Sequence, residues 1–299
     1  MSFSSQIKSE LSLIDNINEC CNHAQVYGLV LFAHYSGLDI SFKTENPDVF
    51  NLYCKSIYKE TGAEPRVITG KAKMMTAVIE GAEAKEKIRS CFGHSSKETS
   101  LRINYANFQN ECCINSFLRG AFLACGSVSD PQKSYHLEFV VPHKKLSSDL
   151  IRLFNELDLS PKYIMRKGNH IVYFKDSESI EDFLAYIGAQ NASLYLMNVK
   201  IEKDVKNQVN RKLNFEMYNL EKTVSASNRQ IEAIEYIEKT SGLSILNDKA
   251  KLVAKLRKNN PEATLSELQK LTDNSISKSG IKHILDRITE TADKMKNGV

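Results

Sequence analysis

The sequence contains one helix-like segment twice, and this repeat constrains the fold more than any other feature. Glu-Cys-Cys occurs at residues 19–21 and again at 111–113, and in each copy six residues separate the second cysteine from a glycine, Gly28 or Gly120. The two copies are therefore 92 residues apart. A repeat at this spacing predicts a domain that is built from two similar halves.

Similar segments follow each copy in the same order. In the first half, the pattern predicts a strand, a helix, a hairpin and a short helix at 37–43, 47–62, 63–80 and 81–93. In the second half, it predicts the same elements at 134–141, 144–159, 161–176 and 177–188. Pro65 and Pro161 hold equivalent places 96 residues apart, which is more than the 92 residues between the two helices. We therefore assign a short insertion to residues 127–131 of the second half. The prediction is an α+β fold in which each half runs helix, two strands, helix, two strands, helix (αββαββα).

Composition is typical of a globular protein from a reducing compartment. The 299 residues are 42% hydrophobic, which is enough for a core and for two domains. The chain has no run of 18 apolar residues and no apolar stretch near its N-terminus, so we expect neither a membrane span nor a signal peptide. Its seven cysteines lack the short, even spacings of a disulfide scaffold. We expect a reduced, cytoplasmic protein.

Positive charge is concentrated near the C-terminus. Residues 222–299 contain 14 Lys and Arg against 10 Asp and Glu, and the totals of 40 and 36 leave 26 against 26 for residues 1–221. The whole excess therefore lies in the last quarter of the chain. Such an excess favours an anionic partner, most simply a phosphate backbone, although basic solvated helices are also common.

Beyond the second half the strand pattern stops. Residues 190–222 predict a long polar helix or linker. A serine-rich segment at Ser225 is predicted to begin a helix that ends at Gly242, and another helix ends before Pro261. The C-terminal region is therefore predicted to be all-helical.

The last part of the sequence predicts a helix-turn-helix at about 264–290. One helix begins at Thr264, where Glu267 three residues later completes a capping box. A second begins at Ser277, after a break at 272–276. This second helix places its apolar residues on one face: Ile281, Ile284, Leu285 and Ile288. Two short helices joined by a tight turn, the second of them basic, are typical of this motif.

The repeated helices resemble a known motif. Val26–His34 and Leu118–Gly126 resemble the motif helices of the LAGLIDADG homing endonucleases, whose fold is a saddle of two such halves. A glycine inside a helix costs about 1 kcal/mol relative to alanine, and this cost is offset where two helix backbones must approach closely. In that family, a carboxylate near the end of each motif binds divalent metal between the helices.

In this chain, Ala33 and Cys125 occupy the positions of those carboxylates. Alanine offers no ligand, and a thiol is a poor ligand for magnesium. Asp39 and Asp130 lie further along, away from the helix ends, and we do not expect them to substitute. The resemblance therefore implies a saddle without catalytic residues, metal or cofactor. An active, metal-dependent DNA endonuclease is the alternative.

A closer resemblance, to the WhiA family of bacterial regulators, extends over nearly the whole chain. It rests on five stretches in the order expected of that family: residues 2–11, 117–140, 207–223, 229–237 and 277–288. The first half departs most from the pattern, because Tyr27 and His34 are unusual inside the motif.

The WhiA resemblance implies a function. It implies sequence-specific binding of double-stranded DNA and transcriptional control linked to cell division, chromosome segregation or sporulation-type development, without catalysis. The implied partners are duplex DNA and other transcription or division proteins, with no membrane and no small-molecule substrate, and the implied location is the nucleoid. An adaptor that acts mainly through protein partners is a further alternative.

These interpretations divide the chain into domains. Residues 1–205 are predicted to form the degenerate LAGLIDADG-like domain, with halves at about 1–95 and 110–190. Residues 206–224 are predicted to be a connecting helix or linker. Residues 225–299 are predicted to form the helical DNA-binding domain.

The second helix of the helix-turn-helix carries the candidate DNA-binding residues. A recognition helix contacts bases and phosphates from its N-terminal turns, which here contain Lys278, Ser279, Lys282, His283 and Arg287. We expect phosphate contacts from Lys282 and Arg287, and contacts with base edges or phosphates from the other three. The alternative is an ordinary basic helix in a three-helix bundle.

Basic residues also lie near the two predicted hairpins of the saddle: Arg66, Lys71, Lys73, Lys162, Arg166 and Lys167. Because residues 1–221 carry no net charge, we expect weak intrinsic affinity for DNA there. This surface is expected to contact DNA only when the tail anchors it, or to bind a protein instead.

The paired cysteines at first suggest a four-thiolate zinc site. Adjacent residues on a helix diverge by about 100°, and structural zinc sites normally use cysteines that are about two to four residues apart. We therefore interpret the four residues as small buried side chains at the start of packed helices: Cys20, Cys21, Cys112 and Cys113. Gly70-Lys71 is interpreted as a hairpin turn, because the phosphate-loop pattern is missing.

Overall fold

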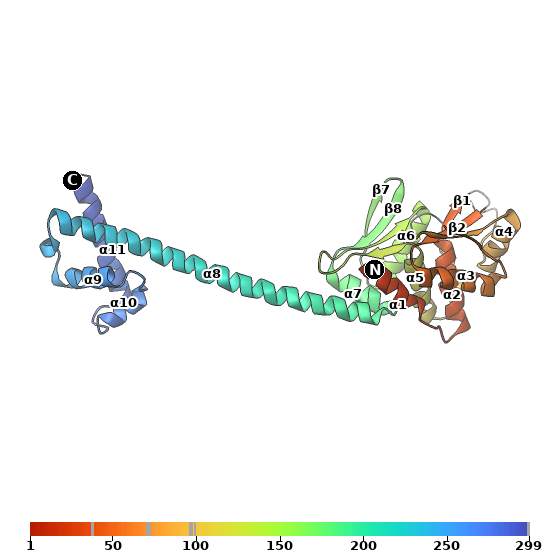
Figure 1. The fold of residues 1–299 in the computed structure, drawn as a ribbon, viewed down its shortest axis with the longest axis horizontal. Helices are drawn as coiled ribbons and strands as arrows, with labels where there is room; N and C mark the ends of the chain where they lie inside the picture. The colour runs from red at the N-terminus through yellow and green to blue at the C-terminus, as the bar shows by residue number, and fades with distance from the viewer. Residues whose placement is uncertain (37–38, 70–72, 96–97, 99, 298–299) are drawn as a thin grey trace. The chain divides into compact units, whose positions relative to one another are not determined.

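The computed structural model describes all residues except 37–38, 70–72, 96–97, 99 and 298–299, and it divides into two compact units (Figure 1). The first unit is Met1–Lys203 and the second is Asp204–Val299. No helix among the described residues is long and apolar enough to cross a membrane.

The first unit contains the predicted duplication. Its first half is α2 (Glu19–Leu31), β1 (His34–Ser36), β2 (Asp39–Thr44), α3 (Pro47–Thr61), β3 (Arg66–Thr69), β4 (Met75–Ile79) and α4 (Ala82–Cys91). Its second half is α5 (Glu111–Cys125), β5 (Gly126–Val128), β6 (Leu137–Val141), α6 (Lys144–Glu156), β7 (Lys162–Arg166), β8 (Asn169–Phe174) and α7 (Ser177–Tyr186). The antiparallel sheets have the equivalent orders β1-β2-β4-β3 and β5-β6-β8-β7. The predicted αββαββα order is confirmed in both halves.

Three details of the first unit differ from the sequence prediction or extend it. Ser127 and Val128 lie in β5 and pair with β6, so the extra residues of the second half follow this strand. The helix α1 (Phe3–Ser12) was not predicted; the Ser2 hydroxyl caps it, and it buries Ile7 and Leu11, which lie one turn apart. The hairpin of β3 and β4 is present, but the predicted turn at Gly70-Lys71 lies outside the described residues.

Each sheet buries alternate residues of its central strands. In β6, Leu137, Phe139 and Val141 are buried and the two residues between them are partly exposed. In β2, Ile40 and Phe42 are buried in the same alternating manner. One face of each sheet is therefore covered by helices, and both halves contribute to a single hydrophobic core.

The two repeated glycines allow α2 and α5 to make backbone contact. A Cβ atom built on Gly28 would lie 2.3 Å from the carbonyl oxygen of Phe117. A Cβ atom on Gly120 would lie 2.1 Å from the carbonyl oxygen of Gln25. No side chain fits at either place, so the predicted close approach of the motif helices is confirmed.

Tyr27, the unusual residue next to Gly28, connects α2 to the segment between the halves. Its hydroxyl oxygen accepts a 2.7 Å hydrogen bond from the backbone N–H of Asn104 and lies 3.0 Å from Nε2 of His94. The ring is buried and stacks on Phe92. Burial raises the pKa of Tyr27 far above its usual value, so the phenol stays neutral and serves as a structural anchor.

A single helix, α8 (Gln190–Thr240), follows the second half. The predicted helix start at Ser225 is wrong, because the serines there do not act as caps. The hydroxyl of Ser227 is buried and donates to the Pro261 carbonyl, and Thr223 donates to the Asn219 carbonyl one turn earlier. The sequence did indicate one continuous helix, because no glycine or proline interrupts residues 190–240.

The second unit is a small helical domain with its own core. After the 3₁₀ turn at Leu243–Ile245 come α9 (Asp248–Asn259), α10 (Leu265–Leu271) and α11 (Lys278–Lys296), which cluster around the C-terminal end of α8 (Figure 1). The buried core includes Ile234 and Ile237 of α8, Val253 of α9, Leu268 of α10 and Leu285 of α11. Since this core shares no residue with that of the first unit, the second unit has its own source of stability.

Candidate nucleic-acid interface

The start of α10 is fixed by the capping box that the sequence predicts. The Thr264 hydroxyl accepts from the backbone N–H of Glu267 at 3.3 Å, and the Glu267 carboxylate accepts from the backbone N–H of Thr264 at 2.7 Å. These hydrogen bonds hold the pKa of Glu267 below its usual value. Both partners are exposed, so the box orients α10 without adding to the core.

The turn between α10 and α11 is tight. Asp273 and Asn274 have φ values of 51° and 58°, a left-handed conformation that these two residue types tolerate well. The Asn274 backbone N–H returns to the Gln269 carbonyl at 3.2 Å, which ends α10. The Ser277 hydroxyl then accepts from the backbone N–H of Gly280 and caps α11. Both helices therefore begin where the sequence predicts.

The apolar face of α11 packs into the second core. Ile281, Leu285 and Ile288 are fully or almost fully buried, and Ile284 is half-buried. This burial fixes which face of α11 points outward, because residues three and four apart share a face.

All five candidate residues lie on the outward part of α11: Lys278, Ser279, Lys282, His283 and Arg287. Within the described part of the chain, Lys278, Lys282 and Arg287 form no ion pair. The Ser279 hydroxyl makes a local contact, 3.1 Å from the Ser277 hydroxyl. The cations are therefore available for an external anion, while the serine and the imidazole offer polar atoms of the kind that contact base edges.

A buried arginine that sequence reasoning missed holds the helices of this unit together. Arg257 of α9 donates a 2.6 Å hydrogen bond to the Ala263 carbonyl just before α10 and lies 3.4 Å from the Ser227 hydroxyl of α8. Burial lowers its pKa. Its burial could have been inferred from the helical spacing, because Arg257 lies about one turn after Val253 and Ala254 on the buried face of α9.

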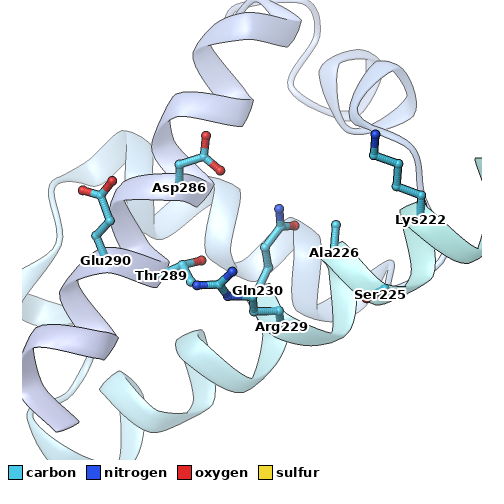
Figure 2. Close-up of a pocket in the computed structure, with 8 residues that line it drawn as sticks. All are labelled: Lys222, Ser225, Ala226, Arg229, Gln230, Asp286, Thr289 and Glu290. Atoms are coloured by element: carbon cyan, nitrogen blue, oxygen red, sulfur yellow. The ribbon is translucent and has the colours of Figure 1, made fainter. Parts of the chain in front are cut away.

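An open groove of about 520 Å³ lies between α8 and α11 (Figure 2). It is lined by Lys222, Ser225, Ala226, Arg229 and Gln230 of α8 and by Asp286, Thr289 and Glu290 of α11. Cations and carboxylates are mixed on its walls, which makes it a poor site for phosphate. Asp286 and Glu290 flank Arg287 along α11, and Lys294 and Lys296 are further basic residues in its last turn.

The basic residues of the saddle are exposed but partly paired. Arg66 donates to the Glu80 carboxylate at 2.8 Å, and Arg166 lies 3.9 Å from Glu138. The other described members of the predicted set are exposed: Lys73, Lys162 and Lys167. Lys71 lies outside the described residues.

The two described residues at the positions of the nuclease carboxylates are not acidic. Ala33 is buried just after α2, and Cys125 is the last residue of α5. Near Cys125 the Lys8 ammonium donates to the Leu123 carbonyl at 3.1 Å. Burial lowers the pKa of Lys8 to about 8 and raises that of Cys125 to about 12.

The two aspartates considered as substitutes take part in local hydrogen bonds. Asp39 accepts from the backbone N–H of Gly81 at 3.2 Å. Asp130 accepts from the backbone N–H of Gln132 at 2.9 Å in the loop between β5 and β6. Neither lies at a helix end, as the sequence predicts.

Comparison with known proteins identifies the family. Residues 114–206 match the WhiA LAGLIDADG-like domain, and residues 209–292 match the WhiA C-terminal HTH domain. A relative from Alkaliphilus metalliredigens named "Probable cell division protein WhiA" is 38% identical over 311 residues, which cover 98% of each chain. The chain belongs to the WhiA family. A second relative of the same name, from Alkaliphilus oremlandii, is 37% identical and covers 100% of this chain and 99% of its own.

A solved structure from the WhiA family agrees with this fold over both units. The full-length DUF199/WhiA structure from Thermatoga maritima covers 98% of this chain and 99% of its own, with 25% identity and a TM-score of 0.61. The chain therefore combines a LAGLIDADG-like domain with a C-terminal helix-turn-helix domain. The LAGLIDADG-like match begins inside α5 and so leaves out the first half, the half whose motif departs most from the family pattern.

Proposed function

We propose that the protein is a sequence-specific, duplex DNA-binding regulator of transcription that acts at the nucleoid. The observation that carries the proposal is the N-terminal half of α11, where three cations are exposed and make no ion pair within the described chain. The capping box and the tight turn orient this helix without using its outward side chains. The names of the relatives support a link to cell division.

Salt-dependent binding of duplex DNA tests this proposal. The affinity of the full chain should fall steeply with salt, because each phosphate contact releases counterions. A chain that ends near residue 222 should lose most of this affinity. If that shortened chain binds as tightly as the full chain, the helix-turn-helix is not the main DNA contact.

We further propose that the saddle is not a nuclease. Ala33 and Cys125 replace the two carboxylates that a shared metal site requires, and the Lys8 ammonium lies near one of these positions. Purified protein should leave supercoiled plasmid intact in the presence of magnesium or manganese. Nicking that depends on the metal and disappears in a Lys8 or Cys125 variant would establish the nuclease instead.

A further inference from the structure

The N-terminal turns of α2 and α5 bring four thiols together. Cys20 and Cys21 lie in the first turn of α2, and Cys112 and Cys113 lie in the first turn of α5. All four sulfur atoms lie within 4.8 Å of one another, and the Sγ atoms of Cys21 and Cys112 are 3.3 Å apart.

This convergence corrects the argument that adjacent cysteines diverge too far to share one centre. The divergence of about 100° applies to neighbours on one helix, but two helices supply these sulfurs. Because Gly28 and Gly120 bring the helix backbones into contact, the first turns also lie close together. Cys21 of α2 then lies beside Cys112 of α5, and Cys20 lies beside Cys113.

The spacing of the sulfurs suits a tetrahedral metal ion. A zinc–sulfur bond of about 2.3 Å places the sulfurs of a tetrahedral site about 3.8 Å apart. The cluster spans this value, so small side-chain rotations would form the site. All four positions would be filled by protein ligands, which is the arrangement of a structural zinc rather than a catalytic one.

Two features at the cluster stabilise negative charge on sulfur. The first turn of each helix carries the positive end of the helix dipole, which stabilises an anion. The side-chain amide of Asn110 lies 3.6 Å from the Cys20 sulfur and donates to it. A bound cation would in addition replace the thiol protons.

Arg119, a buried arginine of α5, bears on whether a negatively charged centre is present nearby. The Arg119 guanidinium is buried and donates to the Ile187 carbonyl at 2.7 Å and to the side-chain oxygens of Asn16 and Gln25 at 2.8 and 3.2 Å. Within the described residues it forms no ion pair with a carboxylate. Burial lowers the pKa of Arg119. An anionic centre here would balance a charge that is otherwise costly to bury.

The cluster is accessible and lies far from the motif ends. Cys112 is exposed and Cys20 is half-buried, so an ion can enter, whereas Cys21 and Cys113 are buried. Ten residues of α2 separate Cys21 from Leu31, the last residue of the helix before Ala33, which corresponds to about 15 Å. The cluster is therefore distinct from the place where a homing endonuclease binds its metal.

We infer that Cys20, Cys21, Cys112 and Cys113 bind one zinc ion that joins the two halves of the saddle at the N-terminal ends of α2 and α5. Binding forms four zinc–sulfur bonds and releases the thiol protons to water, without oxidation or reduction. The resulting centre carries two negative charges, which Arg119 and the two helix dipoles offset.

Metal analysis of the full chain tests this inference. Protein purified under reducing conditions with added Zn²⁺ should retain one zinc per chain after removal of free metal. Cys112→Ser should lower zinc affinity by roughly a hundredfold or more, since one of four ligands is lost. The matched control is Cys54→Ser, which replaces a half-buried cysteine outside the cluster and should leave the zinc content unchanged. Because Cys112 is exposed, its variant should still fold, which circular dichroism checks.

A spectroscopic measurement identifies the ligands. The full chain loaded with Co²⁺ in place of zinc should show the intense visible absorption of a tetrahedral cobalt–thiolate centre, and Cys112→Ser should weaken it. Three results would overturn the inference. The first is a reduced, folded chain that retains no metal, and the second is a metal content that Cys112→Ser and Cys20→Ser do not change. The third is isolation of the native protein with two disulfides between α2 and α5.

Discussion

Two surfaces of this protein expose basic side chains, but they differ in how those side chains are paired. On the saddle, Arg66 and Arg166 each lie next to a carboxylate, Glu80 or Glu138. On α11, no carboxylate of the described chain pairs with Lys278, Lys282 or Arg287. The comparison teaches that exposure alone does not make a phosphate-binding surface; the charge must also lack an internal partner.

Strand register explains one of the two pairs on the saddle. Arg66 is paired with Val78 across β3 and β4, so Glu80 is its diagonal neighbour on the same face. On α11, Lys282 lies one turn from both Lys278 and Asp286, but Lys282 and Asp286 form no ion pair in the described chain. On the saddle the pairing concerns the two arginines, since the exposed Lys73, Lys162 and Lys167 also form no ion pair with a described residue.

The largest expected effect is a loss of stability in the first unit alone, which separates the saddle surface from α11. Gly120→Ala should destabilise the first unit by about 3 kcal/mol or more, because a Cβ atom would lie 2.1 Å from the Gln25 carbonyl oxygen. Thermal unfolding should show the first unit melting much earlier, while the second unit is unchanged. DNA binding should persist at a temperature where only the second unit is folded.

A helical glycine with side-chain neighbours provides the control. A Cβ atom on Gly280 would meet only side-chain atoms, at 3.1 and 3.2 Å from Ile276 and Ser277. Gly280→Ala should therefore change stability by less than about 1 kcal/mol. Equal destabilisation by the two variants would show that the backbone contact at Gly120 does not account for the cost of a side chain at this position.

The next effect concerns the charges themselves. Lys282→Ala combined with Arg287→Ala should reduce the slope of log affinity against log salt by about 1.8, since each lost phosphate contact contributes about 0.9. Fluorescence anisotropy with labelled duplex at several salt concentrations measures this slope. The matched variant, Arg66→Ala with Arg166→Ala, should change it much less. A larger decrease of the slope in the saddle variant would show that the saddle, and not α11, supplies most of the phosphate contacts.

A smaller effect tests how α10 is oriented. Thr264→Ala removes one partner of the capping box and should destabilise the second unit by about 1 kcal/mol. Thr291→Ala is the control, because its hydroxyl only returns to the Arg287 carbonyl within α11. Calorimetric melting of the full chain distinguishes them; equal shifts would show that the box contributes no stability of its own.

The smallest effect is a pH dependence from Glu267. The folded-state pKa of this carboxyl is below its unfolded value, so its contribution is present above the unfolded pKa and is lost as the pH falls through the folded one. Stability of the second unit should therefore decline between about pH 6 and about pH 3. Glu267→Gln keeps a capping oxygen without the charge and should flatten this part of the profile. An unaltered profile would assign the dependence to other carboxyls.

Local patterns in the sequence determined much of the fold. The αββαββα order follows from apolar periodicity, and the capping box at Thr264 and Glu267 follows from residues three apart, because both interactions are made within one element. The packing of the motif helices was also predictable, since only a close backbone contact offsets two glycines inside helices. The continuous α8 and the helix α1 were readable from a missing helix breaker and from Ile7 and Leu11, but they were not predicted.

Only the tertiary structure decided which side chains meet across the chain. Cys21 and Cys112 come together from positions 91 residues apart, and Arg119 is buried among groups from α2, from the residue that follows α7 and from the segment before α2. The repeat predicted that α2 and α5 would pack together, but not their rotation about their own axes, which sets the direction of each sulfur. That rotation depends on the contact at Gly28 and Gly120 and on both sheets packing behind the helices. For this reason, the paired cysteines looked divergent in the sequence and form one cluster in the folded protein.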